Sequence, residues 1–242
     1  MRGDAGAQYN VCLSFYQGWH CEKDGKKVVA WWHKAAALDL ANAQCILGDY
    51  YDEGNVVVQD AALTAKWYGK AAAQSDAMGQ CELGRCYEHG LGVVQDAALA
   101  VKWYEKSVAQ GLAMAQYNLG LCCAHGKGMP QDVARAAELY AMAAAQGNAK
   151  AQLNLGAMYM VGTGAERDIA RALELFRLSI IQDEVGASAS LGQCYEFGVG
   201  VARDASLALQ WYSKAAALGD ARAAAAVARF AAAIRHTPPR AS

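Results

Sequence analysis

Two cysteine-histidine pairs carry the most reactive side chains in the sequence. Cys86 lies three residues before His89, and Cys122 lies three residues before His125. Residues three apart share one face of a helix, so each pair could present a thiol and an imidazole side by side. Four such groups can hold a zinc ion, and a cysteine activated by a histidine can act as a nucleophile.

The helices that must carry these pairs argue against both chemistries. The pairs occupy equivalent positions in adjacent copies of a repeat, because 36 residues separate them. Neighbouring helices stand about 8 to 10 Å apart, so the four side chains would have to lean together to reach one metal. Nothing in the sequence supplies an oxyanion pocket or an acid that orients the histidine. We therefore expect no enzyme activity, no metal and no cofactor.

The period of 36 residues extends along the whole chain. A Leu-Gly pair recurs at this spacing, with the leucines at Leu47, Leu83, Leu119, Leu155 and Leu191. A constant period of this length is typical of a solenoid, in which no repeat buries its apolar face alone. The repeats begin at Ala7, Ala43, Gly79, Ala115, Ala151 and Ala187, with a half repeat at Ala223. We predict one all-α solenoid of about six and a half helix-turn-helix repeats over residues 1–235, capped by the half repeat, and a disordered tail over 236–242.

The first helix of each repeat is marked by glycines. Glycine inside a helix costs about 1 kcal/mol relative to alanine, so its recurrence after the leucine predicts close contact with a neighbouring helix. A further glycine suits the left-handed conformation that ends the helix, at Gly54, Gly90, Gly126, Gly162 and Gly198. From Gly90 on, a second glycine follows two residues later, and this Gly-x-Gly pattern lacks the strand and the lysine of a phosphate-binding loop, so we interpret it as a turn.

The second helix of each repeat is marked by an aspartate and an aromatic residue. The aspartates are predicted N-caps rather than catalytic or metal-binding carboxylates, because every repeat has one: Asp24, Asp60, Asp96, Asp132, Asp168 and Asp204. The aromatic residues are expected in the core, at Trp32, Tyr68, Tyr104, Tyr140, Phe176 and Tyr212.

The charge balance limits the classes of partner that we expect, and the cysteines indicate the redox compartment. The chain holds 22 basic and 23 acidic residues, so we expect no binding to nucleic acid or insertion into a membrane. The eight cysteines do not recur as pairs at fixed offsets, which predicts buried or half-buried thiols in a reducing compartment. We expect a soluble, monomeric, cytoplasmic protein if Met1 is the true start, and a secreted or periplasmic one if a signal has been removed.

The shared pattern of the repeats, LGxxYxxGxGVxxDxxxAxxWYxKAAxQG, resembles the Sel1-like repeat, a branch of the tetratricopeptide superfamily. Residues 84–111 and 191–219 match it best. The resemblance implies a right-handed superhelix whose inner wall is formed by the first helices, and a scaffold or adaptor that binds a protein or peptide in this groove. Cysteine-rich relatives with disulfides are associated with β-lactam-type compounds. The alternative function is therefore a secreted or periplasmic protein that binds or hydrolyses small molecules or peptidoglycan-related ligands.

The resemblance also indicates which positions of the first helix face the groove. In repeats two and three these positions hold Cys45, Asp49, Asp52, Cys81, Arg85 and Glu88. In repeats four and five they hold Tyr117, Leu121, Ala124, Leu153, Ala157 and Met160. We therefore expect the groove to change from charged to apolar along its length.

A second apolar face is expected on the second helices of repeats four and five, where Met142 and Leu178 replace a recurring lysine. Contiguous exposed apolar side chains usually mark a binding site. Our hypothesis is that repeats four and five anchor the partner. The alternative is that tighter superhelical curvature or a swapped neighbour buries these side chains.

Overall fold

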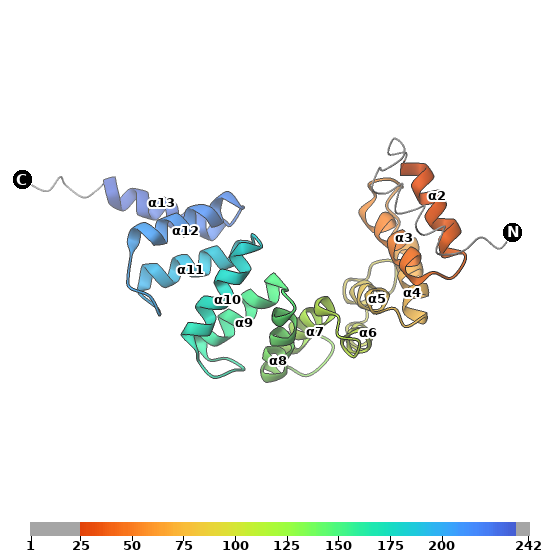
Figure 1. The fold of residues 1–242 in the computed structure, drawn as a ribbon, viewed down its shortest axis with the longest axis horizontal. Coiled ribbons are helices and arrows are strands. Elements are labelled where there is room, and N and C mark those ends of the chain that lie inside the picture. Colours follow the sequence, from red (N-terminus) through yellow and green to blue (C-terminus); the bar gives the residue numbers. More distant parts are fainter. Residues whose placement is uncertain (1–24, 236–242) are drawn as a thin grey trace, which may run out of the picture. The chain divides into compact units, whose positions relative to one another are not determined.

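The computed structural model describes residues 25–235, with side chains from 28 to 232. Twelve α-helices follow one another in this range (Figure 1). They are α2 (Gly25–Ala36), α3 (Ala41–Glu53), α4 (Ala61–Ala73), α5 (Ala77–His89), α6 (Ala97–Val108), α7 (Ala113–His125), α8 (Val133–Ala145), α9 (Ala149–Val161), α10 (Ile169–Ile181), α11 (Val185–Phe197), α12 (Ala205–Ala217) and α13 (Ala221–Arg235). The predicted all-α solenoid is confirmed, and α13 occupies the place of the predicted cap. The predicted tail and the first helix of repeat one lie outside the described residues.

The chain divides into two compact units. Unit 1 ends at Gln131 and contains α2 to α7, and unit 2 begins at Asp132 and contains α8 to α13. Within each unit, every helix packs against the next one along the chain. The boundary falls between the two helices of repeat four, so the single array over residues 1–235 stays a prediction. None of the described helices is long and apolar enough to cross a membrane.

The helix ends are fixed by the residues that the repeat predicts. Asp96 accepts a hydrogen bond from the backbone N–H of Leu99 at 2.9 Å and so begins α6. The other described aspartates of this position, Asp60, Asp132, Asp168 and Asp204, cap their helices in the same way. Gly90 ends α5 with φ of 71°, the left-handed conformation that glycine adopts without strain. The predicted caps are thus confirmed for all described repeats, while Asp24 lies outside the described residues.

The glycine inside each first helix makes room for the aromatic ring of the second helix. A Cβ atom added at Gly84 would lie 2.7 Å from Cε1 of Tyr104, and one added at Gly156 would lie 2.7 Å from Cε1 of Phe176. Both rings are buried in the core, as predicted for this aromatic position. The predicted close contact is therefore confirmed, and it lies between the two helices of one repeat.

A pair of glutamines, one buried in a first helix and one exposed after the second helix, joins successive helices and was not predicted. Gln152 in α9 donates a hydrogen bond to the carbonyl of Ala144 in α8 and accepts one from Gln182, which follows α10, at 3.1 Å. Gln44 with Gln74, and Gln80 with Gln110, form the same pair. Repeat six has Ser188 and Leu218 at these positions, and the buried Ser188 hydroxyl has no hydrogen-bond partner within the described chain.

Candidate functional site

The cysteine-histidine pairs do not assemble a reactive site. Cys86 and Cys122 are buried, whereas His89 and His125 lie at the ends of their helices, outside the core. Burial raises the pKa of Cys86 to about 11 and that of Cys122 to about 12, so both thiols stay protonated at neutral pH. Among residues 25–235, no three His, Cys, Asp or Glu side chains lie together as a metal site would require.

The described cysteines are core residues. The six of them, Cys45, Cys81, Cys86, Cys122, Cys123 and Cys194, occur as buried thiols, as predicted. Cys12 and Cys21 lie outside the described residues. The prediction that Cys45 and Cys81 face the groove is wrong, since both are buried. The Sγ atom of Cys45 instead donates a hydrogen bond to Oδ1 of Asp76, which precedes the next repeat.

The charged groove positions of unit 1 pair with one another. Arg85 in α5 donates from Nε to Glu82 at 2.6 Å and from Nη2 to Asp52 in α3 at 2.7 Å. Asp49 in α3 accepts a hydrogen bond from the Tyr68 hydroxyl at 2.7 Å. Burial raises the pKa of Asp49, and the bond from Tyr68 opposes that rise. Arg85 thus spans the space between α3 and α5.

Glu88, the charged groove residue at the end of α5, also pairs with side chains of other helices and loops in unit 1. It accepts a hydrogen bond from the Tyr104 hydroxyl at 2.8 Å and pairs with Nζ of Lys127 at 3.3 Å. Lys127 belongs to the loop after α7, so the contact joins repeats three and four. The charged positions therefore connect adjacent repeats, and whether they also bind a partner stays a prediction.

The four large apolar side chains among the groove positions of repeats four and five fall into different units. Tyr117 and Leu121 are half-buried on α7 in unit 1. Leu153 and Met160 are half-buried on α9 in unit 2, where both pack against the core formed by α10 and α11. The structure brings Leu153 and Met160 to one groove, and their role in binding stays a prediction.

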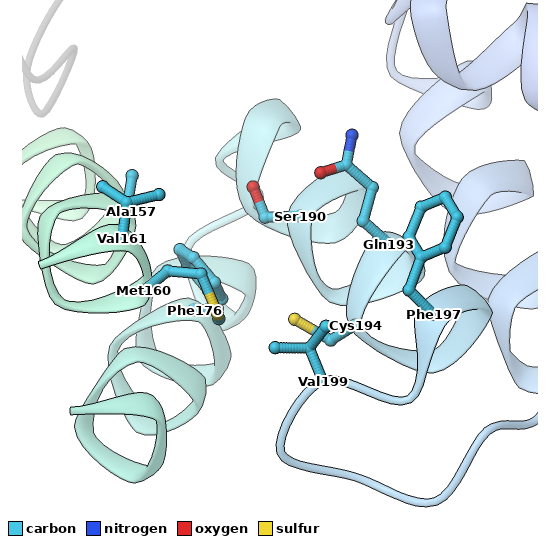
Figure 2. A pocket seen from close by; sticks show the side chains of 9 residues that line it. All are labelled: Ala157, Met160, Val161, Phe176, Ser190, Gln193, Cys194, Phe197 and Val199. Carbon is cyan, nitrogen blue, oxygen red and sulfur yellow. The ribbon is translucent and has the colours of Figure 1, made fainter. Parts of the chain in front are cut away.

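Unit 2 contains an apolar pocket between α9 and α11, with a volume of about 260 Å³. Figure 2 shows Ala157, Met160 and Val161 of α9 on one side and residues of α11 on the other. The full lining is Ala157, Met160, Val161, Phe176, Ser190, Gln193, Cys194, Phe197 and Val199. Val161 is 68% exposed and Phe197 is 67% exposed, so two large apolar side chains at this pocket remain open to solvent.

At this pocket, unit 2 lacks the bridge that Arg85 makes in unit 1. Asp52, Glu82 and Arg85 recur three periods later as Met160, Ser190 and Gln193. All three of the later residues line the pocket. The substitution of an ion-paired bridge by shorter or apolar groups leaves a space that a ligand could fill.

A polar hollow of about 660 Å³ adjoins the pocket, between α11 and α13. Its lining is Leu153, Gly186, Ala189, Ser190, Gln193, Glu196, Phe197, Tyr212, Asp220, Arg222, Ala223, Ala225, Ala226 and Arg229. Ser190, Gln193 and Phe197 of α11 line both spaces, so the pocket and the hollow are adjacent, and we call the two together the groove of α9, α11 and α13.

Sequence reasoning missed several residues of this groove. Phe197 occupies the last position of the first helix, where the preceding repeats have Val161, His125, His89 and Glu53. The change from Glu53, His89 and His125 to the apolar Val161 and Phe197 could have been found by comparing that position across repeats. Arg222 and Arg229 lie on the half repeat, which was interpreted only as a cap.

At the second apolar face, the recurring lysine and a tryptophan that it contacts in unit 1 are replaced together. In unit 1 the recurring lysine lies over a tryptophan three residues earlier, with Lys106 Nζ at 3.9 Å from the centroid of a Trp103 ring. Repeats four and five have Leu139 and Leu175 in place of that tryptophan. Met142 and Leu178, 48% and 42% exposed, thus accompany the loss of a cation–π pair. Their use as a binding face stays a prediction.

Helix pairs that recur every 36 residues, stack in order and present an open groove on their first helices define a helical-repeat solenoid. The Sel1 repeat matches six successive segments, residues 5–40, 41–76, 77–112, 113–148, 149–183 and 186–220. The chain therefore belongs to the Sel1 repeat family. Sel1 repeats typically mediate protein binding, and the repeat fold is usually non-catalytic.

Solved structures of similar chains support the same fold. A protective antigen from uropathogenic Escherichia coli strains is 34% identical, with a TM-score of 0.81 over 95% of this chain and 49% of the antigen. The chain thus spans about half the length of that relative. A Sel1 repeat protein from Oxalobacter formigenes is 32% identical, with a TM-score of 0.82 over 89% of this chain and 88% of the other.

More distant structures share the fold alone. An immunity protein from Pseudomonas aeruginosa is 19% identical, with a TM-score of 0.57 over 89% of this chain and 82% of the other. The search of curated proteins found no match.

Proposed function

We propose that this chain is a non-enzymatic scaffold whose unit 2 binds an extended segment of a partner protein along α9, α11 and α13. The observation that carries the proposal is the open apolar pocket, because the equivalent space of unit 1 is spanned by Arg85. Met160 and Phe197 offer adaptable and aromatic contacts at this pocket. The pocket receives one bulky apolar side chain of the partner.

The size of the effect follows from the burial of that side chain. Burying a leucine-sized or phenylalanine-sized group contributes about 1.5 to 3 kcal/mol. A tenfold change in affinity corresponds to about 1.4 kcal/mol. Loss of the pocket is therefore expected to weaken binding about 10- to 100-fold.

The proposal is tested by closing the pocket with the residues that unit 1 uses. The triple variant Met160→Asp, Ser190→Glu, Gln193→Arg transplants the bridge of Asp52, Glu82 and Arg85 at equivalent positions. The probe is a phage-displayed library of random twelve-residue peptides, selected on the full chain. Selected sequences are then synthesised with a fluorophore, and their affinities are measured by fluorescence anisotropy.

The expected result is that the triple variant loses affinity at least tenfold while its circular dichroism spectrum is retained. The matched control is Ile181→Glu, because Ile181 is an apolar residue of unit 2 that is 77% exposed and lines neither the pocket nor the hollow. Unchanged affinity in the folded triple variant refutes the proposal. Leu121→Asp tests in the same assay whether unit 1 contributes an apolar anchor.

The alternative of a secreted small-molecule or peptidoglycan-related protein receives no support from the groove. That function was inferred from relatives with disulfides, and the six described cysteines are thiols. Intact-mass analysis after alkylation of the unfolded chain reports the redox state of all eight cysteines.

A further inference from the structure

The charged side chains that line the polar hollow differ in how many hydrogen-bond partners they have within the chain. Glu196 is almost covered, with 14% of its side chain exposed, and both of its carboxylate oxygens are occupied. Oε2 accepts a hydrogen bond from the Tyr212 hydroxyl at 2.7 Å, and Oε1 accepts one from Nη2 of Arg229 at 2.6 Å. Glu196 therefore presents little negative charge to a ligand.

The second carboxylate of the hollow is also engaged. Asp220 accepts a hydrogen bond from the backbone N–H of Ala223 at 2.9 Å, in the first turn of α13. An acidic group at this place complements the positive end of the helix dipole. Both acidic side chains that line the hollow thus serve the fold.

The two arginines of the hollow keep most of their donors for a ligand. The Arg229 side chain is 61% exposed and has one carboxylate partner. The exposed Arg222 makes no hydrogen bond or ion pair with the described residues. In unit 1, by contrast, Arg85 has two carboxylate partners and only 29% exposure. The formal charges of the four charged lining residues sum to zero, but the carboxylates are occupied while Arg222 and Arg229 keep N–H donors open to a ligand.

We propose that the partner segment carries an acidic side chain beside its apolar anchor, and that Arg222 and Arg229 bind this carboxylate in the polar hollow. This inference rests on the proposed function of unit 2. A guanidinium presents its N–H donors in a planar fork that matches a carboxylate, which makes arginine the fitting residue for this contact.

The distance between the two spaces sets the spacing in the partner. The pocket and the hollow lie on either side of α11, and a helix with its side chains is about 10 Å wide. An extended chain rises about 3.3 Å per residue. The acidic residue is therefore expected two or three positions from the apolar anchor.

The test uses the full chain and a defined set of synthetic peptides. Each peptide has eight residues, a fluorophore and an amidated C-terminus, so that a side chain supplies the only carboxylate. Leucine or phenylalanine serves as the anchor in a background of alanine and serine. Glutamate, glutamine or lysine is placed two or three positions after the anchor.

The expected result is that the glutamate peptides bind about three- to tenfold more tightly than their glutamine counterparts, and the lysine peptides bind most weakly. Arg222→Gln removes this preference, and Arg222→Glu reverses it in favour of lysine. The control Arg177→Gln keeps it, because Arg177 is exposed on α10 and lines neither space.

Two results overturn the inference in distinguishable ways. Equal affinity for glutamate, glutamine and lysine peptides, with the triple pocket variant still weakening all of them, refutes the acidic preference and leaves the proposed function standing. Peptide binding that is absent, or that the triple variant leaves unchanged, refutes both.

Discussion

The contact between the first-helix glycine and the aromatic ring predicts opposite effects for two alanine substitutions in unit 1. A Cβ atom at Gly84 would lie 2.7 Å from Cε1 and 2.8 Å from Cδ1 of Tyr104. A Cβ atom at Gly69, inside α4, would meet nothing within 4 Å. Both changes remove a glycine from a helix interior. The space around the new methyl group therefore decides whether the free energy of unfolding rises or falls.

The magnitudes follow from these distances. Ordinary contact begins near 3.4 Å, so the Tyr104 ring must retreat about 0.7 Å from a methyl group at position 84, although its hydroxyl is held by Glu88 at 2.8 Å. Such overpacking costs about 1 to 3 kcal/mol, and the better helix propensity of alanine offsets up to about 1 kcal/mol. Gly84→Ala should lower the free energy of unfolding by about 1 to 2 kcal/mol. Gly69→Ala should raise it by about 0.5 to 1 kcal/mol.

Urea denaturation followed by circular dichroism measures the two variants beside the unchanged chain. Hydrogen exchange with mass spectrometry then localises the change to α5 and α6 or to α4. A denaturation midpoint of Gly84→Ala at or above that of the unchanged chain refutes the reasoning. Gly156→Ala offers a further comparison, because Phe176 lacks a hydroxyl and borders the apolar pocket, so a smaller loss is expected.

Three further predictions concern stability. Asp96→Ala removes the N-cap of α6 and should lower the free energy of unfolding by about 1 kcal/mol in urea denaturation. Ser188→Gln with Leu218→Gln builds the missing glutamine pair of repeat six and should slow hydrogen exchange in α12 and α13, since one net hydrogen bond is worth about 0.5 to 1.5 kcal/mol. Burial raises the pKa of Cys86 from about 9 to about 11. Its contribution to stability should therefore be complete below pH 9 and be lost as the pH rises toward 11, which denaturation midpoints across this range will show.

Each of these predictions has a control in the same chain. Asp96→Asn keeps a side-chain acceptor and should retain most of the stability, so an equal loss in both variants contradicts the capping argument. Leu218→Gln alone should not slow exchange, because its partner is missing. Cys86→Ala should show a shallower decline with pH, and an unchanged decline contradicts the assignment to this thiol.

The parts of the fold that depend on one repeat could be predicted from the sequence. An aspartate before a helix, a glycine after one and an aromatic residue opposite a glycine act over a few residues or between two adjacent helices. Asp96, Gly90 and Tyr104 therefore do in the structure what their positions indicate. Their recurrence made the interpretation secure, because every repeat tests it again.

The groove could be predicted only in part, because it forms between repeats. The sequence pointed to Met160 through its apolar character, but the pocket also depends on Ser190 and Gln193 of the next repeat. Cys45 was assigned to the groove by its position in the repeat, but its side chain is buried and its thiol bonds to Asp76, 31 residues along the chain. Contacts across a repeat boundary require the comparison of pairs of positions rather than single positions.

The missing glutamine pair of repeat six has a consequence for α13. A solenoid behaves approximately as a one-dimensional array, in which each repeat is stabilised by its coupling to its neighbours. Leu218 lies in the connection between α12 and α13, so the coupling of α13 to the array lacks a hydrogen bond that other repeats have. The last helix should open more often than its neighbours, and a ligand that touches both α11 and α13 would hold it closed. Binding in the hollow would then slow hydrogen exchange at the C-terminal end of the array.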